Sequence, residues 1–388
     1  MNNWRQGKLS DIAIITMGQS PKSIFYNSLG NGLPFLQGNR MFGSKYPLFD
    51  TYTTSYTKIA EKNDILMSVR APVGDVNIAP AKLVLGRGVC SLRHKEGNHA
   101  FLYYLIRNYS KVFKSEENGT VFDSINRDNI EGLDISIPTN NEQRTIAEVL
   151  SSLDDKIDLL TKQNATLEEL AQTYFRQLFF IETFQDHECF KLDEWVTCVN
   201  GVSYKGTDLK PSRTALVTLK NFNRTGGIRM DGFKEYSGLF KSNHEVFERD
   251  LVVAHTDITQ GAEVIGNPIM VFKPDKYNHL VISMDLVKVI SKKTYISKEF
   301  LYFLMKTNEF KQHCIGYSNG STVLHLSKKA IPSFEFPKST EKKIHDFNIF
   351  AMATMDKIFL NLKSIITLES LRDALLPKLI SGEVQVRQ

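Results

Sequence analysis

The stretch Asn141–Ile181 reads NEQRTIAEVLSSLDDKIDLLTKQNATLEELAQTYFRQLFFI and decides how the rest of the chain is organised. Its apolar residues recur in alternating steps of four and three, the heptad pattern of a helix with one apolar seam. At 1.5 Å per residue this helix would span about 60 Å, so we expect it to cross between two bodies. The seam contains Ile146, Leu150, Leu153, Ile157, Leu160, Leu167, Ala171, Tyr174 and Leu178, with Asn164 as a polar break.

A second stretch of the same kind, residues 340–381, lies near the end of the sequence. Pro377 and Gly382 are expected to end its pattern. Pairing the two helices would remove both seams from water at about 25 cal/mol per Å². We therefore predict an antiparallel pair in which Asn164 fixes the register. The second seam contains Ile344, Phe347, Ala351, Met355, Ile358, Leu362, Ile365, Leu368, Leu371, Leu375 and Leu379.

Composition sets broad limits on the class of protein. The 388 residues are 42% hydrophobic, enough for two ordinary domains and a connector. A net charge of +5 is compatible with a polyanionic partner but does not require one. The four cysteines have neither CxxC nor zinc-finger spacing, so we expect reduced structural thiols in a cytoplasmic protein. We expect neither an export signal nor a membrane span.

Residues 8–138 change to short strand-like runs separated by turn residues. Runs rich in β-branched and aromatic residues lie at Asp11–Met17, Leu33–Gln37, Asp64–Val69, Leu83–Leu92 and Leu133–Ile137. Between them, Phe101–Asn108 is typical of a short buried helix. The pattern predicts a mixed α+β domain.

The same pattern returns after the first long helix. Lys8-Leu9, Gly18 and Leu36 match Lys191-Leu192, Gly201 and Leu219 at one constant offset of 183. The offset grows to 199 at Phe101 and to 201 at Asp155-Lys156-Ile157. A collinear series of this kind indicates a tandem repeat, with each copy one α+β domain followed by one long helix. We predict domains at 1–140 and 182–339, and long helices at 141–181 and 340–381 with a short tail to 388.

Two copies with one scaffold and different loops suit a protein that binds two different targets through the same geometry. An antiparallel helix pair would give the chain an approximate two-fold axis. Readers of nucleic acid that are built on a two-fold place two modules along one duplex. If the modules differ, the site is bipartite and asymmetric.

The sequence lacks the common catalytic motifs. Gly38–Ser44 has the glycine spacing of a phosphate-binding loop but places Ser44 where the lysine should be, and Gly86-Arg87-Gly88 lacks the third glycine of a dinucleotide loop. No H-E-x-x-H or methyltransferase tetrapeptide occurs. For His255 and His325 a structural role is the simpler interpretation. We assign no catalytic residue and no metal site.

Side chains suited to duplex recognition lie near the predicted loops. Arg and Lys can bind guanine edges or phosphates, and Asn and Gln can bind adenine edges. The alternative for each is a solvated surface side chain. The DNA-binding candidates are Gln19, Ser20, Lys22, Asn39, Arg40, Lys45, Arg70 and Arg87 in the first domain, and Tyr204, Lys205, Lys220, Asn221, Asn223, Arg224, His255 and Thr256 in the second.

Several motifs together resemble one known family. They are Trp4–Ile12, Gly18–Pro21 (GQSP), Val69–Gly74 (VRAPVG), Glu142–Arg144 (EQR) at the entry to the first long helix, and Leu371–Glu383 (LRDALLPKLISGE). This set resembles the specificity subunit of a type I restriction-modification enzyme over essentially the whole chain. The second long helix departs from the pattern, because it opens with Glu341-Lys342-Lys343 in place of Glu-Gln-Arg.

The resemblance implies a non-catalytic subunit. Each α+β domain would be a target recognition domain that reads half of a split DNA site, and the helix pair would be the coiled-coil spacer. Two modification subunits carrying S-adenosylmethionine would methylate adenine, and two restriction subunits using ATP and Mg²⁺ could join to cleave DNA. No cofactor is expected on this chain itself.

Two other classes remain open at this point. A protein-binding scaffold would use the helices as a dimerisation or assembly stalk and would show no DNA affinity even with partner subunits present. An enzyme with an unrecognised active site would turn over S-adenosylmethionine or cut DNA unaided. The bases read by the loops are not predictable, because recognition also depends on bound water and DNA deformation.

Overall fold

The computed structural model describes residues 4–114, 124–181, 188–224, 226–259, 261–320 and 322–386. These form two compact units: unit 1 contains residues 1–159 and 364–388, and unit 2 contains residues 160–363. The fold is of the α+β class. Parts of the predicted domain limits, at residues 1–3, 182–187 and 387–388, lie outside the described residues.

Unit 1 contains two sheets and a short strand pair. Strands in the order β2-β10-β7-β8 form an antiparallel sheet, and β3-β5-β4-β9-β6 form a second sheet in which β4 and β9 are parallel. The strands are β1 (Arg5–Lys8), β2 (Ala13–Met17), β3 (Tyr26–Asn27), β4 (Leu33–Leu36), β5 (Tyr52–Thr53), β6 (Ile59–Ala60), β7 (Ile65–Ser68), β8 (Val76–Ile78), β9 (Leu83–Leu85), β10 (Val89–His94) and β11 (Asp134–Ile137), and β1 pairs with β11.

Short helices complete unit 1: α1 (Leu9–Ile12), α2 (His99–Lys114) and α3 (Arg127–Glu131). Helix α2 extends beyond the predicted Phe101–Asn108, and its buried residues 101–106 join the core of the β2-β10-β7-β8 sheet. Two predicted strands differ from the structure. Residues 9–12 form a helical turn before β2, and Leu83–Leu92 is two strands interrupted at Gly86–Gly88.

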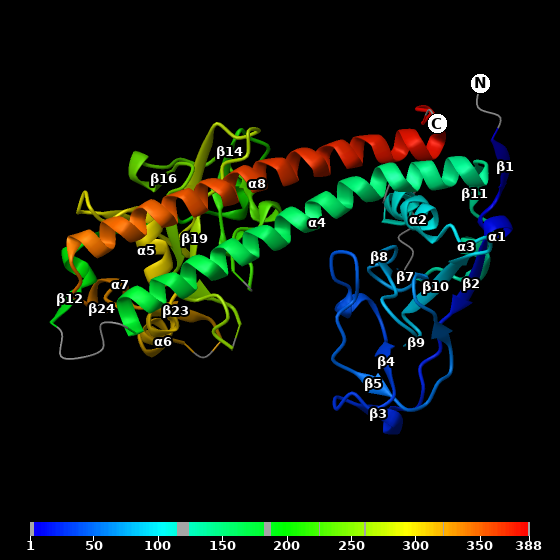
Figure 1. Ribbon diagram of the computed structural model, residues 1–388, viewed down its shortest axis with the longest axis horizontal. Coiled ribbons are helices and arrows are strands. Elements are labelled where there is room, and N and C mark those ends of the chain that lie inside the picture. Colours follow the sequence, from blue (N-terminus) through cyan, green and yellow to red (C-terminus); the bar gives the residue numbers. More distant parts are fainter. Residues whose placement is uncertain are drawn as a thin grey trace. The chain divides into compact units, whose positions relative to one another are not determined.

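Unit 2 contains the strands β12 (Cys189–Lys191), β13 (Val196–Asn200), β14 (Thr214–Val217), β15 (Lys234–Glu235), β16 (Glu245–Val246), β17 (Leu251–Ala254), β18 (Thr256–Asp257), β19 (Pro268–Met270), β20 (His279–Ile282), β21 (Leu286–Ser291), β22 (Ser318–Asn319), β23 (Leu324–Leu326) and β24 (Glu335–Pro337). Its short helices are α5 (Lys298–Met305), α6 (Asn308–Gly316) and α7 (Ala330–Ser333). Helix α5 lies beside β19 (Figure 1).

The two units have matching sheets. In unit 2 the antiparallel order β13-β21-β17-β19 corresponds to β2-β10-β7-β8, and β12–β24 corresponds to β1–β11. The sheet β15-β14-β20-β16 again has a central parallel pair, β14 and β20. A small sheet, β18-β23-β22, is part of unit 2 in addition to these.

Two long helices contribute to both units: α4 (Asn140–Arg176), continued by a π-helical turn at Gln177–Ile181, and α8 (Glu341–Ser381) (Figure 1). A capping box starts α4, because Thr139 and Glu142 exchange side-chain and backbone hydrogen bonds. Pro377 lies inside α8 and does not end it. Instead the helix ends at Ser381, and the following residue, Gly382, has a left-handed φ of 74°.

At some positions of each long helix, the buried residue is the one that follows the predicted seam residue. Leu153 and Leu178 are half-buried and Tyr174 is exposed, whereas the following residues Asp154, Phe175 and Phe179 are buried. In α8, Leu371 is exposed and Leu375 half-buried, whereas Arg372 and Leu376 are buried. A straight helix of 3.6 residues per turn drifts against a strict heptad, which moves the seam. Even so, the ring of Tyr174 packs against Phe347 and Phe350.

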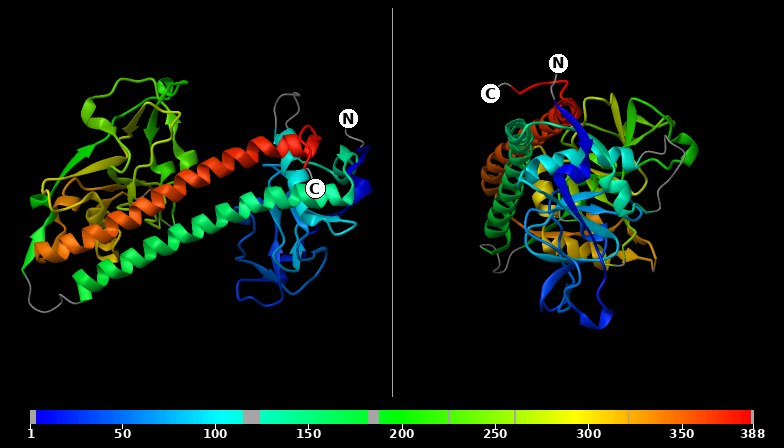
Figure 2. Two further views of the ribbon diagram at one scale, coloured as in Figure 1. Left: turned by 45° about the horizontal axis from the view of Figure 1, so that its top comes forward. Right: turned by 90° about the vertical axis from the view of Figure 1, so that its right-hand side faces the viewer.

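The remaining predicted interface residues are buried or half-buried. Ile146, Leu150, Ile157, Leu160, Ile358 and Leu379 are buried, and Leu167, Leu362 and Ile365 are half-buried. In unit 1 the last turns of α8 run beside the start of α4 (Figure 2), and Leu376, Leu379 and Ile380 share a core with Ile146 and Leu150.

A buried ionic cluster joins α2, α4 and α8 in unit 1. The carboxylate of Asp154 accepts hydrogen bonds from the Tyr104 hydroxyl at 2.7 Å and from Arg372 Nη1 at 2.8 Å. Arg107 Nη1 lies 3.4 Å from the same carboxylate. Burial alone would lower the pKa of Arg372, but its bonds to Asp373 and Asp154 outweigh burial and raise it. Arg372 therefore stays charged inside the seam.

The seam of unit 2 contains an amide pair instead. Asn361, which is buried, donates from Nδ2 to Oδ1 of Asn164 at 2.8 Å and to Gln163 at 2.9 Å. Asn164 also donates to the Ile358 carbonyl at 3.4 Å. Any shift of one helix along the other would leave the buried amide of Asn361 without these partners, so the pair favours one register.

The described part of the chain includes no helix that is both long and apolar enough to cross a membrane.

Candidate nucleic-acid interface

In unit 1, loops that follow or join four strands meet at one end of the paired sheets. This loop end comprises residues 18–22, 37–40, 69–74 and 86–88. The Gly18 N–H donates to the Val89 carbonyl at 3.0 Å, and the Gln19 N–H to Leu85 at 2.9 Å. The Gly88 N–H donates to Gln37 at 3.0 Å and its carbonyl accepts from Val69 at 2.9 Å. The backbone therefore fixes these loops against one another.

Glycine is required where two of these loops touch. A Cβ on Gly18 would lie 2.0 Å from the Gly86 carbonyl oxygen, and one on Gly201, its counterpart in unit 2, would lie 2.1 Å from that of Ser283. Both distances are impossible for real side chains. The close approach explains why the two repeats match at this glycine.

Five of the eight predicted residues of unit 1 lie openly at this loop end. Gln19, Lys22, Arg70 and Arg87 are exposed, and the Ser20 hydroxyl accepts from the Arg87 N–H at 3.2 Å. Ser68 of β7 pairs with Val89 of β10, and two residues beyond that pair Arg70 and Arg87 lie at opposite positions. In the part of the chain that the structure describes, neither arginine side chain forms an ion pair, so both can bind an external anion or base.

The other three are engaged within the protein. Asn39 donates to the carboxylate of Asp75 at 2.7 Å, and Arg40 pairs with Asp50 at 2.7 Å. Lys45 lies at the opposite end of the main sheet, since its carbonyl accepts from Ile78, and its ammonium pairs with Asp155 of α4 at 3.3 Å. Lys45 is therefore removed from the predicted DNA-contacting set.

The loop end of unit 2 is built from the corresponding segments, residues 201–205, 218–224, 226–232, 255–256 and 283–285. The Val202 N–H donates to Ile282 at 2.8 Å and its carbonyl accepts from Met284 at 2.8 Å. The Ser283 N–H donates to Val217 at 3.0 Å, and that of His255 to Asp285 at 2.7 Å. The loops again converge on one end of the two sheets.

Several predicted residues of unit 2 present side chains there. Lys205, Lys220 and Asn223 are exposed. Arg224 is exposed but pairs with Glu263 at 3.0 Å. The hydroxyl of half-buried Tyr204 accepts from Lys234 at 3.1 Å, which holds its ring beside that cation.

Two predicted contacts of unit 2 are wrong. Asn221 is fully buried, accepts from the Thr218 N–H at 2.8 Å and donates to the Arg229 carbonyl at 2.9 Å, so it shapes the loop from inside. Thr256 is 4% exposed and donates to Asp285 at 2.9 Å. Neither side chain can reach DNA without unfolding its loop, because a buried bonded group is costly to free.

His255 borders a cavity of about 250 Å³ that Lys328 and Ser327 also line. Burial lowers the pKa of His255, and the nearby His325 and Lys328 lower it further. The ring is therefore neutral near pH 7. Its buried Nε2 has no hydrogen-bond partner among the described residues. The prediction missed Lys328, which reaches His255 from a distant part of the sequence through strand β23, and no local pattern signals that approach.

The two loop ends share backbone geometry but not chemistry. Strand pairing places Thr256 where unit 1 has Arg70, and exposed Met284 where it has Arg87. Two exposed arginines at one end thus correspond to a buried hydroxyl and an apolar side chain at the other. Such surfaces would recognise different partners.

Comparison with known proteins shows which proteins the chain resembles. Residues 1–169 match the domain family described as "Type I restriction modification DNA specificity domain". The MjaX specificity subunit of Methanocaldococcus jannaschii is 41% identical over 157 residues, which cover 40% of this chain and 37% of that protein. The "Type I restriction enzyme MjaIX specificity subunit" of the same organism is 25% identical over 100% of this chain and 94% of its own length.

A solved structure shows the same fold. The type I restriction-modification S subunit from M. genitalium superposes with a TM-score of 0.58 over 98% of this chain and 96% of that one, at 18% identity. The sequence motifs, the family match and this likeness of fold agree with one another. Residues 1–169 match the type I DNA specificity domain, and over its whole length the chain is similar to type I restriction-modification specificity subunits.

Proposed function

We propose that this chain is the DNA-reading subunit of a type I restriction-modification complex, and that it recognises a bipartite, asymmetric site. One observation carries the proposal: two units use the same backbone frame to gather loops at one end of their sheets, and those loops differ in chemistry. Scaffolds that hold divergent loops are typical of recognition modules. Arg70 and Arg87 suit guanine edges or phosphates, whereas His255 and Lys328 offer a different set of donors.

The proposal also assigns the parts of the chain to two repeats, each with a head and a long helix, and gives each part a role. The matching sheets and the sequence offsets support a tandem repeat of head and long helix. The first head is the segment 4–138, and the second head is the segment 188–339. The two long helices would serve as the coiled-coil spacer that sets the gap between the half-sites. The seam contacts within each unit, including Asn164–Asn361, support a fixed register.

Catalysis would belong to partner subunits. We infer a non-catalytic chain that positions two modification subunits, which carry S-adenosylmethionine for adenine methylation, and two restriction subunits, which use ATP and Mg²⁺. Double-stranded DNA and these subunits are the proposed partners, and the cytoplasm, where DNA and ATP occur together, is the proposed location. The chain itself would bind none of these cofactors.

Exchange of the first head should change one half of the recognised site. If residues 5–138 are replaced by another head of the family, β1 through β11 are exchanged together, and the second head keeps its loops. We expect a new sequence in one half-site and the original sequence in the other. The measurement is the genome-wide map of methylated adenines in cells that also express the modification subunits. A change in both halves would refute separate heads, and DNA-independent assembly would favour the scaffold alternative.

Replacing Arg70 or Arg87 with alanine should weaken DNA binding. A lost base contact should cost about 1–3 kcal/mol and relax one position, whereas a lost phosphate contact should weaken all sequences and lower the salt slope by about 1. Arg40→Ala is the matched control, because Arg40 is exposed but paired with Asp50. Titration of the assembled complex with cognate and mismatched duplexes at several salt concentrations measures both effects. If neither Arg70→Ala nor Arg87→Ala weakens binding more than Arg40→Ala does, these two arginines do not contact DNA.

A further inference from the structure

One backbone feature recurs at the end of each head that faces away from its loop end. Asn63 and Arg249 both have left-handed φ angles, 72° and 68°, immediately before β7 and β17. Their N–H groups donate to Ala79 and Val271, at 2.8 and 2.7 Å. The following aspartates, Asp64 and Asp250, also make matching backbone bonds. These two positions are structurally equivalent.

Near each position a carboxylate projects from a long helix. In unit 1 it is Asp155 of α4, and in unit 2 it is Asp356 of α8, its counterpart at the repeat offset of 201. Both carboxylates are mostly exposed, with 69% and 62% of the side chain accessible. Each is nevertheless paired with a cation that belongs to the head of its own unit.

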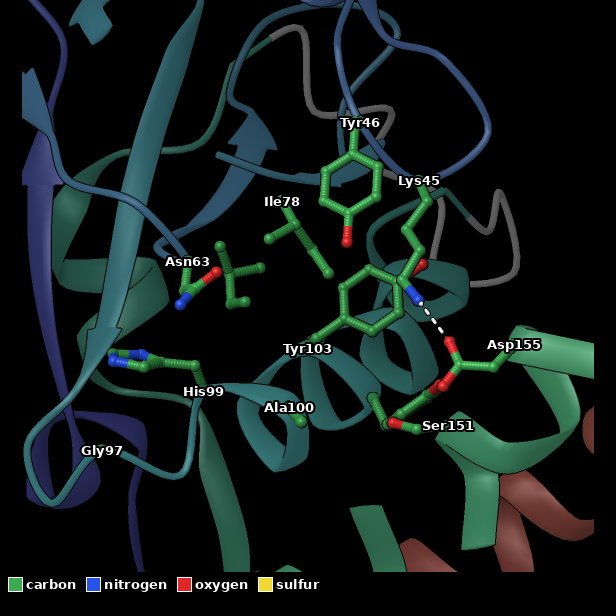
Figure 3. A pocket seen from close by; sticks show the side chains of 12 residues that line it. Lys45, Tyr46, Asn63, Ile78, Gly97, His99, Ala100, Tyr103, Ser151 and Asp155 are labelled. Carbon is green, nitrogen blue, oxygen red and sulfur yellow. Dashed lines mark hydrogen bonds and ion pairs between the residues drawn. The ribbon is translucent and has the colours of Figure 1, made fainter. Parts of the chain in front are cut away.

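In unit 1 the cation is Lys45. Its ammonium lies 3.3 Å from Asp155 Oδ1, and only 18% of the lysine side chain is exposed. Burial would lower the pKa of Lys45, but the hydrogen bond to Asp155 outweighs burial and raises it. Figure 3 shows this bond at the edge of a cavity of about 370 Å³, with Asn63 on the opposite side. The short side chain of Asn63 leaves that space open.

In unit 2 the cation comes from a different position of the head. Arg249 takes the position of Asn63, and its Nη1 reaches Asp356 at 2.5 Å. Its guanidinium also lies 4.9 Å from the ring centroid of Phe359, a cation–π contact with the same helix. Different head residues in the two repeats thus meet the same helix position. Such a match has no explanation in the packing of either core alone.

We infer that Lys45–Asp155 and Arg249–Asp356 are latches that fix the angle of each head on its long helix, and that they thereby set the tolerance of the DNA gap. This inference rests on the proposed function. Ion pairs with a mostly exposed carboxylate contribute little to stability, so we assign these two a role in positioning the heads. A head turned by about 10° would move a loop about 20 Å from the pivot by about 3.5 Å, close to the rise of one base pair.

The test breaks and then restores each latch by charge reversal. Asp155→Lys and Asp356→Lys break them; Lys45→Asp with Asp155→Lys, and Arg249→Asp with Asp356→Arg, restore them with opposite polarity. Aspartate tolerates the left-handed φ of position 249. Glu148→Lys on α4 and Asp346→Lys on α8 are the controls, since both residues are exposed and the structure shows no ion pair for them among the residues it describes.

The readout is the methylated motif mapped in cells with the modification subunits. The broken variants should keep both half-site sequences and methylate sites whose gap is one base pair longer or shorter about fivefold more than wild type. The restored pairs should return to a single gap, and the controls should keep it. The thermal midpoint should stay within about 4 °C throughout.

Three results would overturn the latch: a single gap in the broken variants, a relaxed gap in the controls, or no recovery in the restored pairs. The proposed function has a separate point of failure. A wild-type chain that directed no bipartite methylation would refute that function, whereas a wild-type bipartite motif with unchanged variants would refute only the latches.

Discussion

Two extra residues in each long helix are expected to abolish sequence-specific methylation, whereas four extra residues are expected to preserve it at a longer gap. The chain passes between the two units at two points only, 159/160 in α4 and 363/364 in α8. Insertions after Leu159 and after Lys363 therefore lengthen both passages and leave each unit's own contacts, including Asn164–Asn361 and Asp154–Arg372, in place.

The two insertions differ because each added residue rotates the rest of the helix about its axis by about 100°. Two residues rotate everything beyond the insertion by about 200°, so one head would face away from a duplex held by the other. Four residues advance the helix by about 6 Å and rotate it only about 40° beyond a full turn. At about 3.4 Å per base pair, the gap should grow by one or two base pairs while both half-site sequences stay the same.

Mapping of methylated adenines distinguishes these cases. The matched control is an insertion of four residues into α4 alone, which should disrupt the pairing and reduce assembly. Methylation at the original gap by the variant with four residues in both helices would show that the helices do not set the spacing.

Asp154→Ala should destabilise unit 1 by about 3–5 kcal/mol. The substitution leaves Arg372 charged and buried against α4, with only the exposed Asp373 as a partner, and a broken buried pair is far more costly than a lost surface pair. The hydroxyl of Tyr104, which is buried in the core, would also lose its acceptor.

The second repeat shows how the same place can be packed without charge. At the repeat offset of 201, Asp154 of α4 corresponds to Met355 of α8, and Arg372 of α8 corresponds to Ala171 of α4. Where unit 1 has Asp154 and Arg372, unit 2 therefore has Met355 and Ala171. Both are buried, and Phe303 replaces Tyr104. The triple variant Asp154→Met, Arg372→Ala, Tyr104→Phe should therefore recover most of the lost stability, because apolar replacements of buried ion pairs are often neutral or stabilising.

Unit 1 can be followed on its own, because Trp4 lies in unit 1 and Trp195 in unit 2. In a Trp195→Phe background, urea unfolding followed by tryptophan fluorescence reports the free energy of unfolding of unit 1. A loss below about 1 kcal/mol for Asp154→Ala, or a triple variant as unstable as Asp154→Ala, would contradict this account of the cluster.

Periodicity locates the long helices to within a few residues, but it does not identify every buried position. It favours Leu153 over Asp154, and Leu371 over Arg372, because a pattern of apolar residues cannot include a charge that is neutralised by a distant partner. The repeat likewise indicates matching heads, since Gly18 and Gly201 are constrained by local backbone contact.

Single side chains at the loop ends are harder to predict. Asn221 and Thr256 carry groups that suit base recognition, but their hydrogen-bonding capacity is used inside the loops. Lys45 is drawn to Asp155, which lies far along the chain on α4. Long-range pairing of this kind leaves no local trace in the sequence, whereas Arg70 and Arg87 follow directly from strand ends and turns.

The two-part composition of unit 1 has a consequence for synthesis on the ribosome. Unit 2 is one continuous segment, but the core of unit 1 is closed by Leu376, Leu379 and Ile380, which are translated after all of unit 2. A nascent chain that has emerged from the ribosome as far as residue 363 can complete the second core while Ile146 and Leu150 still lack their cover. The half made first is thus finished last, and during that interval its apolar seam is the part of the nascent protein most exposed to chaperones and to aggregation.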